Sequence, residues 1–297
     1  MTSALAALLA CAGQTVLYAQ DPILQTKYTA DPAPMVYNDT VFLYTSHDED
    51  DAQGYGFKML DWQLYTSTDM VNWTDHGPIA SLKDFTWRKR DNGAWALQVV
   101  ERNGKFYMYC PLHGNGIGVL VSDSPYGPFK DPIGKPLVWQ KEHWDDIDPT
   151  VYIDDDGQAY IYNGGGGTCK GGRLKDNMME LDGAMRTMEG LVDFHEATWI
   201  HKYNGVYYLS YSDNHEPGQE GVAGWNRMHY AISDHPLGPW KHMGIYMQPT
   251  RPETGVTNHG SIVQYKGQWF AFYHNSALSG DPWLRSVCVD RLYHNAD

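Results

Sequence analysis

Cysteine and positive charge are both scarce in this chain of 297 residues. Of its 4 cysteines, the three that follow the N-terminal segment are odd in number and far apart, with no CxxC pair: Cys110, Cys169 and Cys288. Neither a disulfide framework nor a cysteine zinc site is therefore expected. Lysine and arginine number 22 against 36 aspartates and glutamates, which gives a net charge of −14. Because this charge repels phosphate backbones and anionic lipid, nucleic acid is not expected as a partner.

Charge is absent altogether from the first twenty residues, which contain an apolar run from Ala4 to Ala12. This run has the length of an export-signal core and is too short to span a bilayer. We interpret residues 1–20 as a signal peptide cleaved after Ala19, so the protein would be secreted or periplasmic. The basic start of such signals is missing, which indicates an initiator further upstream. In an alternative interpretation, Leu8-Leu9-Ala10-Cys11 is a lipoprotein box, and Cys11 would anchor an outer-membrane lipoprotein.

Aromatic residues are abundant, with 21 tyrosines and 11 tryptophans, and five aromatic stretches end in a tyrosine. These tyrosines are Tyr44, Tyr109, Tyr162, Tyr211 and Tyr273. Five or six residues before each one stands the second residue of a turn pair that favours tight hairpins. The pairs are Asn38-Asp39, Asn103-Gly104, Asp156-Gly157, Asn204-Gly205 and Lys266-Gly267. Each tyrosine strand is therefore predicted to be the second arm of a β-hairpin.

The spacing of the tyrosines predicts the architecture, because the intervals of 65, 53, 49 and 62 residues each hold a four-stranded antiparallel unit. Five such units predict an all-β fold, a five-bladed β-propeller that residues 21–297 form as a single domain. A second repeat places a Ser-containing turn before Trp73, Phe129 and Trp240. One blade between Phe129 and Trp240 lacks it, and we expect this to be the blade that holds LysAspAsnMet at 175–178.

One position of the repeat carries ionisable side chains. Thirteen to fifteen residues before the five tyrosines stand Asp31, Trp95, Asp148, Glu196 and His259. The innermost strand of each propeller blade lines the central channel, so equivalent positions form a ring at one end of it. A single Asp-Pro is more often a turn initiator. Three carboxylates at one repeat position nevertheless indicate a functional site, because crowded like charges shift the pKa values that catalysis uses.

Five segments resemble a known family: ADPAPMVYNDTVFLYTSHDED, DMVNWTDHG, DIDPTVYIDDDGQAYIYNGG, HEATWIHKYNGVYYLSYS and TNHGSI. They are similar to glycoside hydrolase family 43, five-bladed propeller enzymes that act on arabinose- and xylose-containing polysaccharides. The resemblance implies an inverting mechanism with Asp31 as general base, Glu196 as general acid and Asp148 as orienter and pKa modulator. The family's usual Glu-Gly-Pro-Trp reads Glu196-Ala197-Thr198-Trp199 here, which leaves the subgroup and substrate open.

Inversion requires a base that activates water on one face of the sugar and an acid on the other, roughly 6.5 to 9.5 Å apart. Glu196 must stay protonated near neutral pH, and both burial and an anionic Asp148 would raise its pKa. Arg285 resembles the family's blade-five arginine, a substrate-binding candidate that we expect to pair with Asp148 unless it forms a surface salt bridge. No cofactor is expected for the chemistry.

Other residues are candidates for metal or substrate. Related enzymes place a ligand of a central cation, often calcium, at the position of His259, where water would supply most ligands; the alternative is a core histidine. Trp95, Trp87 and Phe194 are candidates to stack on a sugar ring, although aromatic residues in sheets more often belong to the core. Trp95 is favoured because of its place in the ring.

The expected activity is an exo-acting α-L-arabinofuranosidase that releases arabinofuranose from arabinoxylan or arabinan. A β-xylosidase is the next interpretation, and a galactofuranosidase or an endo-arabinanase of the same fold is a further one. A non-catalytic propeller that binds carbohydrate or presents its face to a protein partner would need none of the three acids. The expected partner is thus a plant polysaccharide or oligosaccharide, and a membrane only if Cys11 is lipidated.

Overall fold

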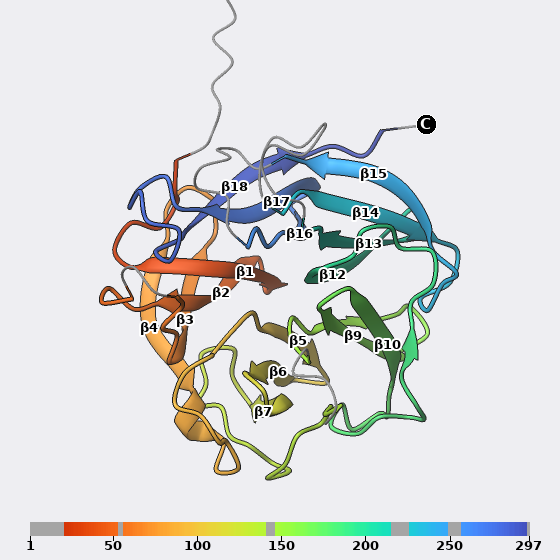
Figure 1. Ribbon diagram of the computed structural model, residues 1–297, viewed down its shortest axis with the longest axis horizontal. Helices are drawn as coiled ribbons and strands as arrows, with labels where there is room; N and C mark the ends of the chain where they lie inside the picture. The colour runs from red at the N-terminus through yellow and green to blue at the C-terminus, as the bar shows by residue number, and fades with distance from the viewer. Residues whose placement is uncertain (1–20, 53–55, 141–145, 215–225, 249–256, 296–297) are drawn as a thin grey trace, which may run out of the picture.

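The computed structural model describes residues 21–52, 56–140, 146–214, 226–248 and 257–295. Five small antiparallel sheets stand around a central axis, which confirms the five-bladed propeller (Figure 1). Blades one and two comprise β1 (Tyr28–Tyr37), β2 (Thr40–Asp48), β3 (Asp61–Ser67) and β4 (Thr74–Ser81), then β5 (Gln98–Arg102), β6 (Lys105–Leu112) and β7 (Gly116–Ser122). Blade three comprises β8 (Thr150–Ile153), β9 (Ala159–Gly165), β10 (Thr168–Leu174) and β11 (Arg186–Thr187). Blades four and five comprise β12 (Glu196–Tyr203), β13 (Val206–Ser212), β14 (Met228–Ser233) and β15 (Lys241–Met247), then β16 (Ser261–Tyr265), β17 (Gln268–Asn275) and β18 (Ser286–Leu292).

The predicted hairpins join the first two strands of each blade. In four of the five turn pairs both residues have positive φ, from 46° to 82°, as a tight hairpin turn of the primed type requires. The exception is Asp156-Gly157, where only the glycine has positive φ and the Asp154 N–H donates to the Gln158 carbonyl instead. The predicted hairpin is therefore present in every blade, and only in blade three is its connection longer than the predicted tight turn, because the last strand pair is Ile153 with Ala159.

The repeat tyrosines are at most 2% exposed, and three of them connect neighbouring blades. The hydroxyl of each of these three donates to a backbone carbonyl in the turn of the next blade. The pairs are Tyr44 with Pro125, Tyr109 with Met178, and Tyr162 with Pro236. Met178 stands where blades two and four have Pro125 and Pro236 and where blade one has Met70. The blade that lacks the Ser-containing turn is therefore blade three, which holds the LysAspAsnMet segment, as predicted.

Two blades have three strands where four were expected. Between β7 and β8 the described residues make only isolated bridges, Val121 with Lys130 and Ile117 with Val138. This stretch contains four prolines, at 125, 128, 132 and 136, which cannot donate to a strand ladder. In blade five, the Ile23 N–H donates to the Val287 carbonyl on β18 at 2.9 Å. The N-terminal segment therefore lies beside the last strand, and β1 packs against blade five to close the ring.

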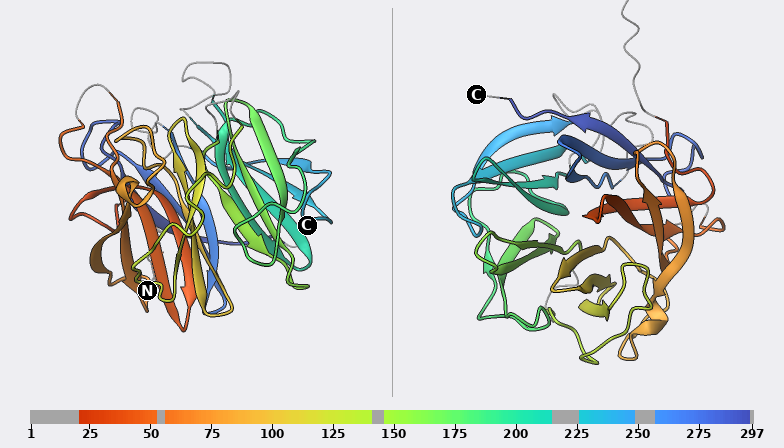
Figure 2. Two further views of the ribbon diagram at one scale, coloured as in Figure 1. Left: turned by 90° about the horizontal axis from the view of Figure 1, so that it is seen from below. Right: turned by 180° about the vertical axis from the view of Figure 1, so that it is seen from behind.

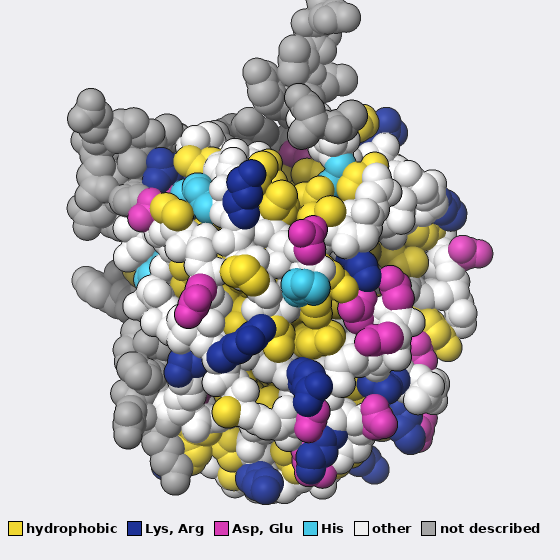
Figure 3. All heavy atoms as spheres, turned by 90° about the vertical axis from the view of Figure 1, so that its right-hand side faces the viewer, with side chains coloured by type: hydrophobic (Ala, Val, Ile, Leu, Met, Phe, Trp, Pro, Cys, Tyr) yellow, Lys and Arg dark blue, Asp and Glu magenta, His cyan; other side chains and the backbone are white. Residues whose placement is uncertain are grey.

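The five blades form one compact ring in every direction of view. Seen from below and from behind, the blades are arranged side by side around one axis as a single unit (Figure 2). The side of the ring shown in Figure 3 carries basic and acidic side chains interspersed with apolar ones. No helix in the described ranges is long and apolar enough to cross a bilayer. Cys11, Ala19 and the rest of residues 1–20 lie outside the described residues.

Candidate active site

The three predicted acids meet in one cavity at the ring position that the repeat indicates. Asp31 lies on β1, Asp148 lies two residues before β8, and Glu196 begins β12. They line a cavity of about 200 Å³. The other described residues that line it are Phe57, Met59, Trp95, Ala96, Ile147, Thr257, His259 and Arg285. Six of the eight residues selected from the sequence therefore line a single cavity.

The backbone around the acids adopts an unusual conformation. Asp31, Asp148 and Ala197, the residue after Glu196, have φ of 51°, 53° and 64°. Left-handed backbone costs a non-glycine residue about 1–3 kcal/mol. The pairing register of β1 and β12 also shifts at these points, as in a β-bulge. Because a bulge changes the direction of a side chain, these departures aim the acids into the cavity.

Arg285 pairs with Asp31 and Asp48, not with Asp148 as we expected from the sequence. Its Nη1 lies 3.2 Å from Asp31 Oδ1, and its Nη2 and Nε lie 2.8 and 2.9 Å from the two carboxylate oxygens of Asp48. The backbone N–H of Arg285 also donates to Asp48 Oδ2. Arg285 is 3% exposed, so the alternative of a surface salt bridge is wrong as well. Asp48, the last residue of β2, is thus a second carboxylate partner of Arg285. No repeat in the sequence indicated it.

The electrostatics of the cavity move the pKa values of Asp31 and Glu196 in opposite directions. Burial raises the pKa of Asp31, but the charge of Arg285, with His274 and His259, outweighs it and leaves that pKa below its ordinary value. Burial and, after it, the charge of Asp31 raise the pKa of Glu196 to about 7. The burial effect is as expected from the sequence, but the charge that raises this pKa is that of Asp31 and not that of Asp148. Two carboxyl groups whose environments move their pKa values apart are the arrangement that acid and base catalysis uses.

Asp148 lies directly against the segment that carries Glu196. The Ala197 N–H donates to Asp148 Oδ2 at 2.7 Å, and the Thr198 hydroxyl donates to the Asp148 carbonyl. Burial, followed by repulsion from Glu196 and Asp31, raises the pKa of Asp148 well above its ordinary value. Asp148 and Glu196 therefore titrate as a coupled pair, so a substitution of one changes the titration of the other.

His259 lies between two of the acids. Its Nδ1 is 4.0 Å from Asp31 Oδ1 and 3.8 Å from Asp148 Oδ2. Burial, with a smaller effect of Arg285, lowers the pKa of His259 to about 4, so the ring is neutral at neutral pH. Among the described residues, the one group of three ligand-type side chains at ion-binding spacing is His47, Glu49 and Asp61, and it does not include His259.

The three aromatic candidates have different surroundings. Trp95 lines the cavity, and its carbonyl accepts a hydrogen bond from Trp62 Nε1 at 2.8 Å. Phe194 does not line the cavity; it is 9% exposed and packs on Tyr211 in the core between blades. Trp87 packs on Phe85 and donates to Asp131, also away from the cavity. Both expectations were wrong because residue type alone does not distinguish a core aromatic from a sugar platform.

Several cavity residues carry no signal in the sequence. Phe57 and Met59 lie in the connection between β2 and β3, and the Phe57 ring covers the Arg285 guanidinium at 4.3 Å. Their chain positions match nothing in the other blades. His274, which lies beside the cavity without lining it, immediately follows the repeat tyrosine of blade five, and the other blades have no histidine at that position.

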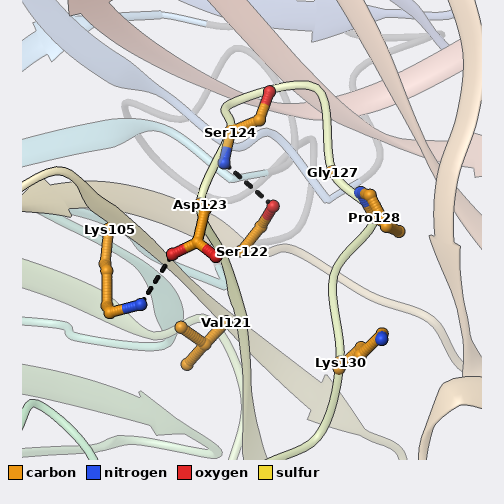
Figure 4. Close-up of a pocket in the computed structure, with 8 residues that line it drawn as sticks. All are labelled: Lys105, Val121, Ser122, Asp123, Ser124, Gly127, Pro128 and Lys130. Carbon is orange, nitrogen blue, oxygen red and sulfur yellow. Dashed lines mark hydrogen bonds and ion pairs between the residues drawn. The ribbon is translucent and has the colours of Figure 1, made fainter.

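A second hollow, of about 370 Å³, lies at the turn that follows β7 (Figure 4). Lys105 and Asp123 form an ion pair of 2.6 Å in it, with side chains 53% and 84% exposed. A single exposed ion pair places no acid and base opposite each other. The chemistry therefore belongs to the cavity at the ring.

Comparison with known proteins agrees with this site. A family model described as glycosyl hydrolases family 43 matches residues 19–297. The chain is 35% identical to a xylosidase/arabinosidase of Bacteroides ovatus, over 91% of this chain and 93% of that protein. It is 33% identical to a β-xylosidase of Xylanibacter ruminicola, over 93% of this chain and 96% of that protein.

Two solved structures have the same fold. One is an α-L-arabinofuranosidase from Clostridium thermocellum, with 39% identity and a TM-score of 0.77, covering 91% of this chain and 92% of the other. The second is a β-xylosidase/α-arabinofuranosidase from a compost microbial metagenome, solved with xylotriose in a calcium-free form. It has 31% identity and a TM-score of 0.81, and the match covers 94% of this chain and 95% of that one.

Proposed function

The chain belongs to glycosyl hydrolase family 43 and hydrolyses O-glycosyl bonds, and from this premise we propose that it is an inverting, exo-acting α-L-arabinofuranosidase. Its substrates would be plant cell-wall polysaccharides such as arabinoxylan or arabinan. The observation that carries the proposal is the pair of acids in one cavity, with Asp31 held ionised beside Arg285 and the Glu196 pKa at about 7.

The two carboxyl groups divide the reaction between them. Asp31, kept anionic by Arg285, takes a proton from a water molecule, whose oxygen attacks the anomeric carbon. Glu196 gives its proton to the glycosidic oxygen as the bond to the leaving group breaks. Asp148 acts on Glu196 as its partner in a coupled titration and through its hydrogen bond to the Ala197 N–H.

The size of the cavity favours exo action on a single terminal sugar. Pockets for drug-sized ligands usually measure about 300–1,000 Å³, whereas this cavity of about 200 Å³ suits one pentose ring. Between the two solved structures, identity is 39% to the α-L-arabinofuranosidase and 31% to the β-xylosidase/α-arabinofuranosidase, which supports arabinofuranose over xylose. A β-xylosidase remains the second candidate, because relatives with that activity match the chain over nearly the same length.

A calcium ion at the centre of the ring stays a prediction. The neutral His259 ring has a nitrogen lone pair to offer, but calcium prefers oxygen ligands. Asn258 Oδ1 and Ser261 Oγ, close to His259 in the chain, are buried atoms without a hydrogen-bond partner among the described residues. These residues fit an ion that water largely coordinates. Such an ion would add positive charge beside the acids, and neither proton transfer above depends on it.

Export of the protein is likewise a proposal from the sequence. A polysaccharide substrate is too large to enter a cell, which suits either cleavage after Ala19 or a lipid anchor at Cys11. Residues 21–297 would then be the exported propeller domain.

The proposed activity can be tested with p-nitrophenyl α-L-arabinofuranoside and β-D-xyloside, followed by product analysis on arabinoxylan and arabinan. We expect kcat/KM to be at least about tenfold higher for the arabinofuranoside, a typical discrimination by pocket shape. Proton NMR of the first product should show an inverted anomeric configuration. Retention would mean that Asp31 attacks the sugar directly, and a preference for the xyloside would favour the second candidate.

Asp148→Asn is expected to move the alkaline limb of the pH profile toward acid. The asparagine can still accept from the Ala197 N–H. In the wild type the two carboxyl groups titrate as a pair whose second proton is held to higher pH by their mutual repulsion, whereas in the variant Glu196 titrates alone and is deprotonated at lower pH. A shift of about one pH unit corresponds to about 1.4 kcal/mol. Natural linkages, which need protonation, should slow more than aryl glycosides. An unchanged alkaline limb with both substrates slowed equally would make Asp148 a sugar-binding or structural residue.

A further inference from the structure

His274 is a buried histidine beside the catalytic centre that the scheme above does not use. It lies on β17 and is 3% exposed. Its Nδ1 lies 3.0 Å from the backbone nitrogen of Asp31, and its Nε2 lies 2.7 Å from the carbonyl oxygen of Thr257. An N–H can only donate and a carbonyl can only accept. The ring is therefore the neutral tautomer with its hydrogen on Nε2, and each nitrogen makes a different kind of bond.

The two backbone groups that His274 binds belong to residues in left-handed conformation. Asp31 has φ of 51° and Thr257 has φ of 54°. Neither is glycine, so each conformation is strained and persists only where the surroundings hold it. The His274 side chain is short and lies on β17, which pairs with both β16 and β18. It is therefore a rigid group that can hold these two backbone conformations.

Arg285 connects the side chains of the same two residues. Its Nη1 lies 3.2 Å from Asp31 Oδ1 and 3.1 Å from Thr257 Oγ1. His274 thus joins the two backbones while Arg285 joins the two side chains, and the four hydrogen bonds form a closed ring. Within this ring, the direction of the Asp31 carboxylate depends on the backbone that His274 holds.

Thr257 is itself anchored to the neighbouring blade. Its N–H donates to Asn226 Oδ1 at 2.9 Å, and Asn226 Nδ2 donates to the carbonyl of Asp213 at 2.7 Å. Asp213 immediately follows β13. A continuous path of hydrogen bonds therefore runs from blade four through Thr257 to His274 on blade five, and from there to Asp31 on blade one.

From this geometry we propose that His274 is a positioning residue for the catalytic base, and that its acceptor bond from the Asp31 N–H keeps the carboxylate aimed at the attacking water. The inference rests on the proposed function, because it needs Asp31 to be the base. His274 does not line the cavity, so it acts through Asp31 and has no contact with substrate.

Two substitutions distinguish the two hydrogen bonds of the His274 imidazole, the one to the Asp31 N–H and the one to the Thr257 carbonyl. In His274→Asn the side-chain oxygen stands near the place of Nδ1 and can still accept from the Asp31 N–H. In His274→Gln the longer side chain brings its amide nitrogen near the place of Nε2, so it keeps the bond to Thr257 and loses the one to Asp31. A purely structural histidine would be replaced equally well, or equally badly, by both.

We expect His274→Gln to lower kcat by about 10- to 100-fold with little change in KM, because small errors in placing a reacting group cost that much. His274→Asn should stay within about threefold of wild type. Thermal unfolding of both variants gives the folded fraction to which each kcat is referred. Equal kcat values for the two variants, whether high or low, would overturn the positioning role.

Asp31→Ala, measured beside them, separates this inference from the proposed function. If Asp31→Ala is inactive while the two His274 variants are equal, only the positioning role fails. If Asp31→Ala keeps wild-type turnover, Asp31 is not the base, and both proposals are overturned.

Discussion

Replacing Glu196 or Asp31 with alanine is expected to slow hydrolysis of arabinoxylan by about 10² to 10⁴-fold, the usual contribution of a general acid or base. The variants should fold, because in Asp31→Ala the buried Arg285 keeps its two bonds to Asp48, and Glu196→Ala removes a carboxyl group that has no such cation of its own among the described residues. The wild-type rate should decline as pH rises through about 7, where Glu196 loses its proton. The rate of Glu196→Ala should no longer decline there.

The leaving group provides the control for this prediction. A p-nitrophenyl glycoside needs little protonation, so Glu196→Ala should retain far more of its rate on that substrate than on arabinoxylan. Asp31→Ala should slow both substrates alike, because every substrate needs the activated water. Near wild-type turnover of either variant on the polysaccharide would show that the roles are assigned wrongly.

Arg285→Met is expected to destabilise the protein by about 3–5 kcal/mol at neutral pH, as the loss of one partner of a buried ion pair does. The substitution leaves two buried carboxylates, Asp48 and Asp31, without the guanidinium whose nitrogens lie 2.8 to 3.2 Å from their oxygens. Chemical denaturation measures the free energy of unfolding. Arg285→Lys should also lose stability, because an ammonium cannot bind both carboxylates with the same fork.

The dependence of this loss on pH follows from the sign of the Asp31 shift. In the wild type the pKa of Asp31 lies below its ordinary value, so the stabilising charge is present above pH of about 4 and is lost as the pH falls further. In Arg285→Met, the largest effect that opposes burial is removed, so the pKa of Asp31 rises. The difference in stability between the two proteins should therefore shrink in acid. The double variant Arg285→Met, Asp48→Asn should recover part of the loss at neutral pH, and its failure to do so would contradict this account.

The repeat in the sequence was sufficient to predict the fold and the positions of the three acids. Hairpin turns and buried tyrosines recur because each blade solves the same packing problem, so their spacing reports the architecture directly. Asp31, Asp148 and Glu196 share one repeat position, and a ring of equivalent positions can only converge on the axis. For the same reason Trp95 and His259 were found, whereas Phe194 and Trp87, which no ring position supports, were misplaced.

The sequence by itself thus determined the propeller and which residues meet at its centre, because both follow from periodicity along the chain. Only the tertiary structure decided how those residues are paired. Arg285 binds Asp31 and Asp48 rather than Asp148, and His274 holds the Asp31 backbone, through contacts between residues more than two hundred positions apart. Such contacts depend on left-handed backbone at Asp31 and Thr257 and on distances of a few ångströms, which no spacing in one dimension encodes.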